Sequence, residues 1–93
     1  MIKEIKRTSQ FKKDYKRAIK QGCDEKDFKE VLLFLINQES LPEKYCDHKL
    51  ADTNVYKNVR ECHINPDWLL IYRINNQELI LELIRTGSHS KLF

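Results

Sequence analysis

The sequence has 93 residues, of which 41% are hydrophobic and 33% are charged, with a formal net charge of +3. This length fits one domain, and this composition excludes an intrinsically disordered chain. No apolar run approaches the roughly 20 residues that a membrane-spanning helix needs, and the N-terminus lacks the apolar stretch of a signal peptide. We therefore expect a single domain over residues 1–93, located in the cytoplasm and without membrane contact.

The N-terminal part of the chain predicts a strand followed by two helices. Apolar and charged residues alternate over Ile2–Arg7, which favours an edge strand. The Thr8-Ser9 pair can cap a first helix, whose apolar residues recur at helical spacing before Gly22. A second helix begins at Asp24 and ends near Asn37-Gln38, and its wide apolar stripe predicts burial on more than one side. The short break between them predicts an antiparallel helical hairpin.

The rest of the chain predicts a long loop and three strands. Residues 40–54 show no sustained period, which indicates a long ordered loop. Strands are expected over residues 56–64, 68–74 and 79–85, with turns at Asn65-Pro66 and Asn75-Asn76 and a short tail to the end. The order β-α-α-β-β-β indicates an α+β fold, in which a mainly antiparallel sheet packs against the N-terminal helical hairpin.

The positive charge is concentrated in residues 1–30, which carry ten Lys or Arg and six Asp or Glu, whereas residues 31–93 have a net charge of −1. This excess is either a solvated helix face or a contact surface for a polyanion, whose binding would depend on salt. The residues that would make this contact lie in the first predicted helix and are Lys12, Lys13, Lys16 and Arg17.

Residues that could carry chemistry gather at the borders of the predicted elements. The histidines His48, His63 and His89 each lie where a loop meets a regular element. Asp67 follows His63 across a turn, and a hairpin there would hold the imidazole and the carboxylate close together. Histidine can give or take a proton near neutral pH, and Arg85 could hold a phosphate with paired donors. These residues lack the spacing of a preformed metal site, so we expect neither a metal nor a cofactor. The three cysteines have no CxxC spacing, which favours reduced thiols.

Three linked stretches carry a family resemblance: Asp47–Leu50 with the pattern DHxL, Arg60–Tyr72 with RxxHxxPDWLLIY, and Arg85–Phe93 with RxGxHxxLF. Together they resemble the YafQ-type branch of the RelE/ParE superfamily, the toxins of bacterial type II toxin–antitoxin pairs. The predicted order of elements agrees with this RelE-like fold over all 93 residues. Two departures adjoin His48. Lys49 stands where the family commonly has proline, and the glycine usual after Leu50 is missing, so the loop is expected to differ here.

The resemblance implies a metal-independent, ribosome-dependent endoribonuclease, which cuts mRNA by attack of the ribose 2′-hydroxyl. It implies a cognate antitoxin protein as partner, with operator DNA bound only through the antitoxin complex. The site residues that it implies are His48, His63, Asp67, Arg85, His89 and Phe93. We expect His89 to act as general acid and Arg85 as transition-state stabiliser, with the general base left open between Asp67 and His63. Phe93 would stack on a base.

Two alternatives stay open at this point. The first is a ParE-like protein that blocks DNA gyrase by binding and cleaves no RNA. That branch would not require three histidines and an aspartate at one face. The second is a binding module whose basic first helix contacts nucleic acid without catalysis.

Overall fold

The computed structural model describes residues 1–93, and its main elements follow the predicted order. In chain order they are β1 (Glu4–Arg7), α1 (Ser9–Lys20), α2 (Glu25–Ile36), η1 (Glu43–Tyr45), β2 (His48–Lys49), β3 (Arg60–Asn65), β4 (Trp68–Asn75), β5 (Ile80–Gly87) and α3 (His89–Leu92). The 3₁₀ turn η1, strand β2 and helix α3 are short elements within segments expected to be loop or tail. None of the helices is long and apolar enough to cross a membrane.

The helix ends form as their sequence signals predict. The Thr8 side chain accepts a hydrogen bond from the Phe11 amide at 2.9 Å and caps α1. At the other end of α1, Gly22 takes a left-handed backbone with φ of 99°, which glycine adopts at little cost. Asp24 caps α2 by accepting from the Lys26 amide. These caps satisfy backbone groups that have no partner inside the helices.

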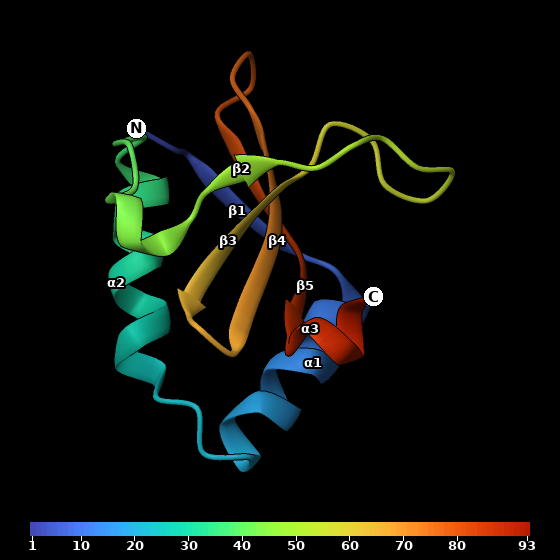
Figure 1. Cartoon of the computed structure of the whole chain (residues 1–93). Helices are drawn as coiled ribbons and strands as arrows, with labels where there is room; N and C mark the ends of the chain where they lie inside the picture. The colour runs from blue at the N-terminus through green and yellow to red at the C-terminus, as the bar shows by residue number, and fades with distance from the viewer.

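The five strands form one mixed sheet in the order β1-β5-β4-β3-β2 (Figure 1). Strand β1 runs parallel to β5 and lies at one edge, while all other neighbouring pairs are antiparallel. The predicted α+β class, the mainly antiparallel sheet and the edge position of the first strand are therefore confirmed.

Helices α1 and α2 cover the same face of the sheet and enclose the main core. This core brings Phe11 of α1 and Phe28 of α2 against Trp68 and Leu70 of β4. The two helices run in clearly different directions (Figure 1), with α1 packed on β5 and α2 on β3. They meet through aromatic side chains, and the Tyr15 and Phe28 rings lie 5.0 Å apart between centroids. A smaller core of Val59, Ile71 and Ile84, together with Leu50, Tyr56 and Leu92, is separate from this cluster.

Several predicted boundaries are wrong. Strand β3 begins at Arg60, so residues 56–59 are not strand; they continue the extended loop that projects from the sheet in Figure 1. The turn expected at Asn75-Asn76 occupies residues 76–79, where the Asn75 side chain accepts from the amides of Gln77 and Glu78. Leu79 takes a left-handed backbone there, and β5 begins one residue later and extends to Gly87.

Candidate active site

The register of the sheet aligns several predicted site residues in a row across four strands. His48 of β2 lies opposite Glu61 of β3, Glu61 lies opposite Ile71 of β4, and Ile71 lies opposite Arg85 of β5. Side chains opposite each other in neighbouring strands stand on the same side of a sheet. Ile71 belongs to the smaller core and not to the core under α1 and α2. The row therefore lies on the sheet face away from these two helices.

A second row, two residues further along each strand, brings the remaining histidines towards the first row. His63 lies opposite Leu69, and Leu69 lies opposite Gly87, which directly precedes the start of α3. Since neighbouring strands are about 4.8 Å apart, the His63 and Gly87 backbones are separated by roughly 10 Å. His63 and His89 therefore flank one short stretch of the sheet. His63 lies on β3, and His89 begins the helix that follows β5.

Both register irregularities of the antiparallel sheet fall beside these rows. One lies between His63 and Asn65, and the other lies where Ile71 and Tyr72 pair with β5 next to Arg85. A bulge re-aims the neighbouring side chains and increases the local twist. Bulges are frequent beside active sites for this reason, so their positions agree with a functional role for this face.

Glu61 is a buried carboxylate between two histidines, and it is not among the site residues predicted from the sequence. Its Oε1 lies 3.5 Å from Nε2 of His48 and 3.8 Å from Nε2 of His63, while its Oε2 is buried without a hydrogen-bond partner. His48 also contacts the Cys46 carbonyl oxygen through Nδ1 at 2.7 Å. Despite the unusual sequence of its loop, His48 thus reaches the site face. The i, i+2 spacing of Glu61 and His63 on a strand was the signal that could have indicated Glu61.

Asp67 lies apart from the Glu61 carboxylate and from the two histidines beside it. It is exposed in the turn formed with Pro66 and makes no hydrogen bond or ion pair with His63 or any other residue. The hairpin was expected to hold His63 and Asp67 close together. The structure does not place them within ion-pair distance, because His63 lies opposite Leu69 inside the ladder and Asp67 lies at the tip.

The C-terminal segment folds into the one-turn helix α3 and presents two predicted site residues to solvent. The His89 and Phe93 rings lie 5.2 Å apart, and both side chains are exposed. Between them, Leu92 packs on the smaller core and fixes the helix to the sheet. Gly87, shortly before this helix, has a φ of 153°, which L side chains rarely adopt, whereas a Cβ there would meet Leu92 only at an ordinary contact distance of 3.6 Å. An exposed imidazole beside an exposed aromatic ring suits contact with a nucleotide.

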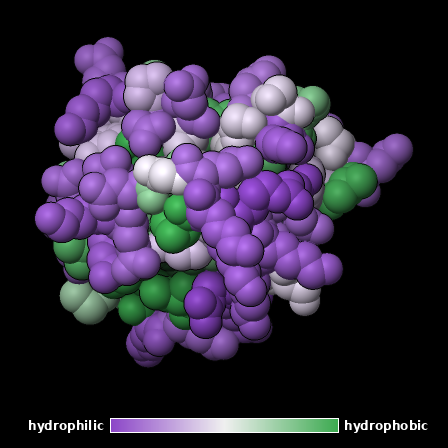
Figure 2. Space-filling view, turned by 90° about the horizontal axis from the view of Figure 1, so that it is seen from below, coloured by the Kyte–Doolittle hydropathy of each residue, from purple (hydrophilic) through white to green (hydrophobic).

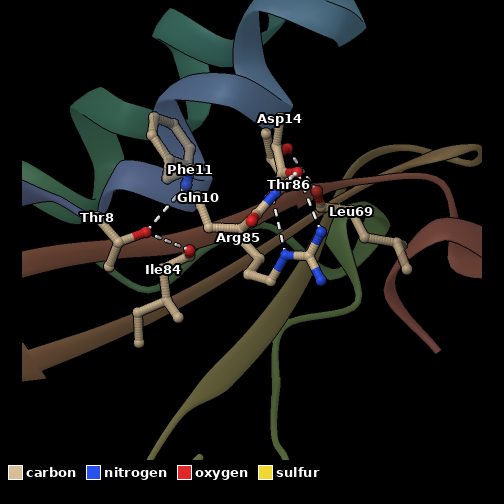
Figure 3. Close-up of polar contacts among 8 residues, drawn as sticks. All are labelled: Thr8, Gln10, Phe11, Asp14, Leu69, Ile84, Arg85 and Thr86. Carbon is tan, nitrogen blue, oxygen red and sulfur yellow. Dashed lines mark hydrogen bonds and ion pairs between the residues drawn. The ribbon is translucent and has the colours of Figure 1, made fainter.

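Arg85 is not free but paired with Asp14 of α1 (Figure 3). Its Nε donates to Asp14 Oδ2 at 2.9 Å and its Nη2 donates to Oδ1 at 3.0 Å. These bonds raise the pKa of Arg85. Burial alone would raise the pKa of Asp14, but the hydrogen bonds that it accepts, first from Arg85, outweigh burial and lower it below 3.8. The guanidinium is therefore a fixed positive charge at the edge of the site.

We predict that replacing Asp14 with asparagine destabilises the fold in a pH-dependent way. Because the pKa of Asp14 is lowered on folding, its contribution is fully present above its unfolded value of about 3.8 and is lost as the pH falls through the folded value. Hydrogen bonds to charged groups contribute about 1.5–3 kcal/mol, which sets the expected loss at pH 7. Urea unfolding of both proteins from pH 7 to pH 3 measures the difference. It should narrow in acid, and a difference that widened there would contradict the assigned pairing.

A second ion pair anchors the loop that carries His48. Asp47 accepts hydrogen bonds from Nε and Nη2 of Arg60 and from the Tyr72 hydroxyl. The bonds with Asp47 raise the pKa of Arg60, while burial and then Asp47 raise the pKa of Tyr72. Because Asp47 precedes His48 directly, these contacts hold the short strand β2 against β3.

The four basic residues predicted to meet a polyanion are all exposed on α1. Lys13, Lys16 and Arg17, together with Lys20, line a shallow hollow of about 320 Å³, which Lys12 does not line. The lower side of the molecule, where the end of α1 lies in Figure 1, is largely hydrophilic with separate hydrophobic patches (Figure 2). The basic hollow on α1 suits contact with a phosphate backbone because its lining side chains are positively charged.

The site residues do not form a metal-binding group. Although two histidines flank Glu61, no three His, Cys, Asp or Glu side chains are arranged to hold an ion. The side chains around Glu61 offer acid–base chemistry.

Comparisons with known proteins agree with this fold. A family described as "Bacterial toxin of type II toxin-antitoxin system, YafQ" matches residues 3–93. The mRNA interferase toxin YafQ of Escherichia coli (strain B / BL21-DE3) is 39% identical over 92 residues, which cover 98% of this chain and 96% of that protein. The structure of the E. coli DinJ–YafQ complex is similar, with a TM-score of 0.87 and 37% identity, and the match covers 100% of this chain and 99% of that one. A metal-bound toxin from Helicobacter pylori, 43% identical, has a TM-score of 0.88 with both chains fully covered.

The fold and these matches define the class of protein as a toxin of a bacterial type II toxin–antitoxin system. Within that class, the chain belongs to the YafQ family.

Proposed function

We propose that this toxin is an endoribonuclease that cuts mRNA on the ribosome and uses the histidine-bearing face as its active site. The observation that carries the proposal is the row of His48, Glu61 and Arg85 across the sheet, with His63 in the neighbouring row. The name of the E. coli relative, mRNA interferase toxin YafQ, supports the same activity. Proton donors and acceptors beside a fixed cation are what cleavage of an RNA phosphodiester requires.

The reaction that we propose is an internal transesterification. A general base takes the proton of the ribose 2′-hydroxyl, and the 2′-oxygen attacks the adjacent phosphorus. The bond from phosphorus to the 5′-oxygen breaks, and His89 gives its proton to that leaving oxygen. The products are a 2′,3′-cyclic phosphate and a 5′-hydroxyl. Arg85 faces the charge that develops on the phosphorane, and Phe93 stacks on a base.

The general base is His63 or Asp67, and their surroundings favour His63. An imidazolium formed on His63 would face the Glu61 carboxylate 3.8 Å away, whereas Asp67 has no partner in the turn. A buried carboxylate beside a catalytic imidazole also restricts the orientation of the ring. Glu61 thus lies against the rings of both His48 and His63 and acts as a positioning residue.

No step of this reaction passes through a metal ion. The similar Helicobacter pylori toxin is metal-bound, but no three His, Cys, Asp or Glu side chains of this chain are arranged to hold an ion. We propose that cleavage persists after the protein has been treated with EDTA. The assay itself contains enough magnesium to keep the ribosomes intact.

The partners that we propose are a cognate antitoxin and the translating ribosome with its mRNA, with operator DNA bound only through the antitoxin complex. The solved complex of a YafQ protein with DinJ supports the antitoxin. Expression of the toxin alone should arrest growth, and co-expression with the neighbouring open reading frame should restore it.

We predict that replacing Lys12, Lys13, Lys16 and Arg17 with glutamine weakens ribosome binding and flattens its dependence on salt. Each lost phosphate contact should reduce the slope of log K against log salt by about 0.7–0.9. Binding is measured at 50–200 mM salt. The control replaces four other exposed lysines, which are Lys3, Lys6, Lys26 and Lys44. Equal affinities for both variants at every salt concentration would show that the α1 charges are only a solvated face.

The direct test of the function uses translating ribosomes programmed with a defined message. The wild-type protein should cut the message, and ribosomes without the protein should leave it intact. A ParE-like inhibitor of gyrase would cut no message and would block supercoiling instead. A binding module without catalysis would associate with ribosomes and do neither.

A further inference from the structure

Asp14 collects more polar contacts than a simple link between helix and sheet requires (Figure 3). Besides the two bonds from Arg85, its carboxylate accepts from the Thr86 amide at 3.3 Å and from Gln10 Nε2 at 2.9 Å. The Asp14 side chain is only 2% exposed. Four donors from two elements thus fix one buried carboxylate, which leaves the bound guanidinium a single orientation.

The location explains why a helix residue can reach the site. Strand β1 pairs with β5 only as far as Leu83, so the edge of β5 beyond that residue has no strand neighbour. Helix α1 covers this edge instead: the Thr8 hydroxyl donates to the Ile84 carbonyl at 2.7 Å, and Asp14 accepts from the Thr86 amide. Arg85 lies between these two attachments. Its partner therefore comes from α1 and not from the sheet.

The geometry of the pair leaves part of the guanidinium available. Asp14 engages Nε and Nη2, and Nη1 makes no bond with it. The Arg85 side chain remains 21% exposed. A two-bond fork holds the plane of a guanidinium in a way that a single contact does not. Nη1, which Asp14 does not bind, is thus held in one direction before a substrate arrives. The Tyr56 side chain also interacts with this guanidinium and helps to raise its pKa.

We propose that Asp14 is a positioning residue, which holds the Arg85 guanidinium so that Nη1 meets the scissile phosphate. This inference rests on the role proposed for Arg85 above. Preorganised charge is effective because no reorganisation is needed during the reaction, and a misplacement of about 1 Å can cost 10²-fold in rate. The basic residues Lys13 and Arg17 lie on the same helix, so the surface proposed to bind RNA and the residue that orients Arg85 move as one body.

The experiment compares Asp14→Asn with Thr8→Val in message cleavage on ribosomes, at a temperature where both variants are fully folded. Thr8 also attaches α1 to β5 but does not touch Arg85, so it controls for a purely structural role. Asp14→Asn should lower kcat by about 10²-fold with little change in KM. Thr8→Val should lower Tm and leave kcat within a few-fold of wild type. An Asp14→Asn variant with wild-type or raised kcat, or with a loss no larger than that of Thr8→Val, would overturn the proposal.

A double-mutant cycle with Arg85→Gln separates this inference from the proposed function. When Arg85 is absent, Asp14→Asn should cause no further loss of kcat, because its effect acts through the guanidinium. Additive losses would instead assign Asp14 a role independent of Arg85 and reject the inference. Full activity of Arg85→Gln alone would refute the role of Arg85 in the proposed mechanism, a distinct result.

Discussion

Replacing His89 with alanine is expected to lower the rate of message cleavage on the ribosome by about 10²–10⁴-fold, the usual contribution of general acid catalysis. The loss should appear in kcat, because His89 is assigned to the leaving oxygen and not to ribosome binding. His89 is exposed at the start of α3, and its one aromatic contact is with Phe93. Exposed substitutions of this kind change stability by no more than about 0.5 kcal/mol. The measurement is single-turnover cleavage of a programmed message.

Ser90→Ala is the matched control for His89→Ala, since Ser90 is the next residue of the same short helix and is also exposed. It should cut at the wild-type rate. Equal cutting by His89→Ala and the wild type would remove His89 from the mechanism, and an equal loss in both variants would indicate only that α3 had been disturbed.

Replacing Trp68 with alanine is expected to cost about 3–5 kcal/mol of unfolding free energy, the usual cost of truncating a large buried aromatic residue. Trp68 is 1% exposed and packs against Tyr15 and Phe28 of the two covering helices. Its Nε1 is buried without a hydrogen-bond partner, and such a donor costs about 1–3 kcal/mol. Trp68→Phe removes this donor and keeps most of the ring, so its cost should be much smaller. Urea unfolding measures both variants.

Val55→Ala is the control for the Trp68 variants, because Val55 is 78% exposed in the projecting loop and should leave stability unchanged. If Trp68→Phe cost as much as Trp68→Ala, the unpartnered Nε1 would have to make a contact that stabilises the fold, and the assignment of Trp68 to the core alone would be wrong.

The elements that could be predicted from the sequence are those with strong local signals. Helical periodicity, the caps at Thr8 and Asp24, and the left-handed Gly22 are properties of a few neighbouring residues. The boundaries that failed depend on tertiary contacts. Tyr56 and Val59 are residue types that favour strands, yet the loop before β3 is closed by its own hydrogen bonds, including that from the Asn58 amide to the Asp52 side chain.

The candidate site could be predicted in part, for a similar reason. His48, His63 and His89 stood out because histidine is rare in this chain, and the family resemblance linked them. Glu61 and Asp14 did not stand out because the chain has fourteen acidic residues. Only the register of β2, β3 and β5 and the packing of α1 show which two of them are buried beside an imidazole or a guanidinium.

We propose that the histidine-bearing face of the sheet cleaves RNA by 2′-hydroxyl attack, with protein side chains as acid and base. The most direct measurement is the chemistry of the new ends, determined on message cut in translating ribosomes after EDTA treatment of the protein. We expect undiminished cutting, a 2′,3′-cyclic phosphate on the upstream fragment and a 5′-hydroxyl on the downstream one. A 3′-hydroxyl with a 5′-phosphate would contradict 2′-hydroxyl attack. Loss of cutting by the EDTA-treated protein on intact ribosomes, reversed when metal is returned to the protein, would contradict a metal-independent reaction.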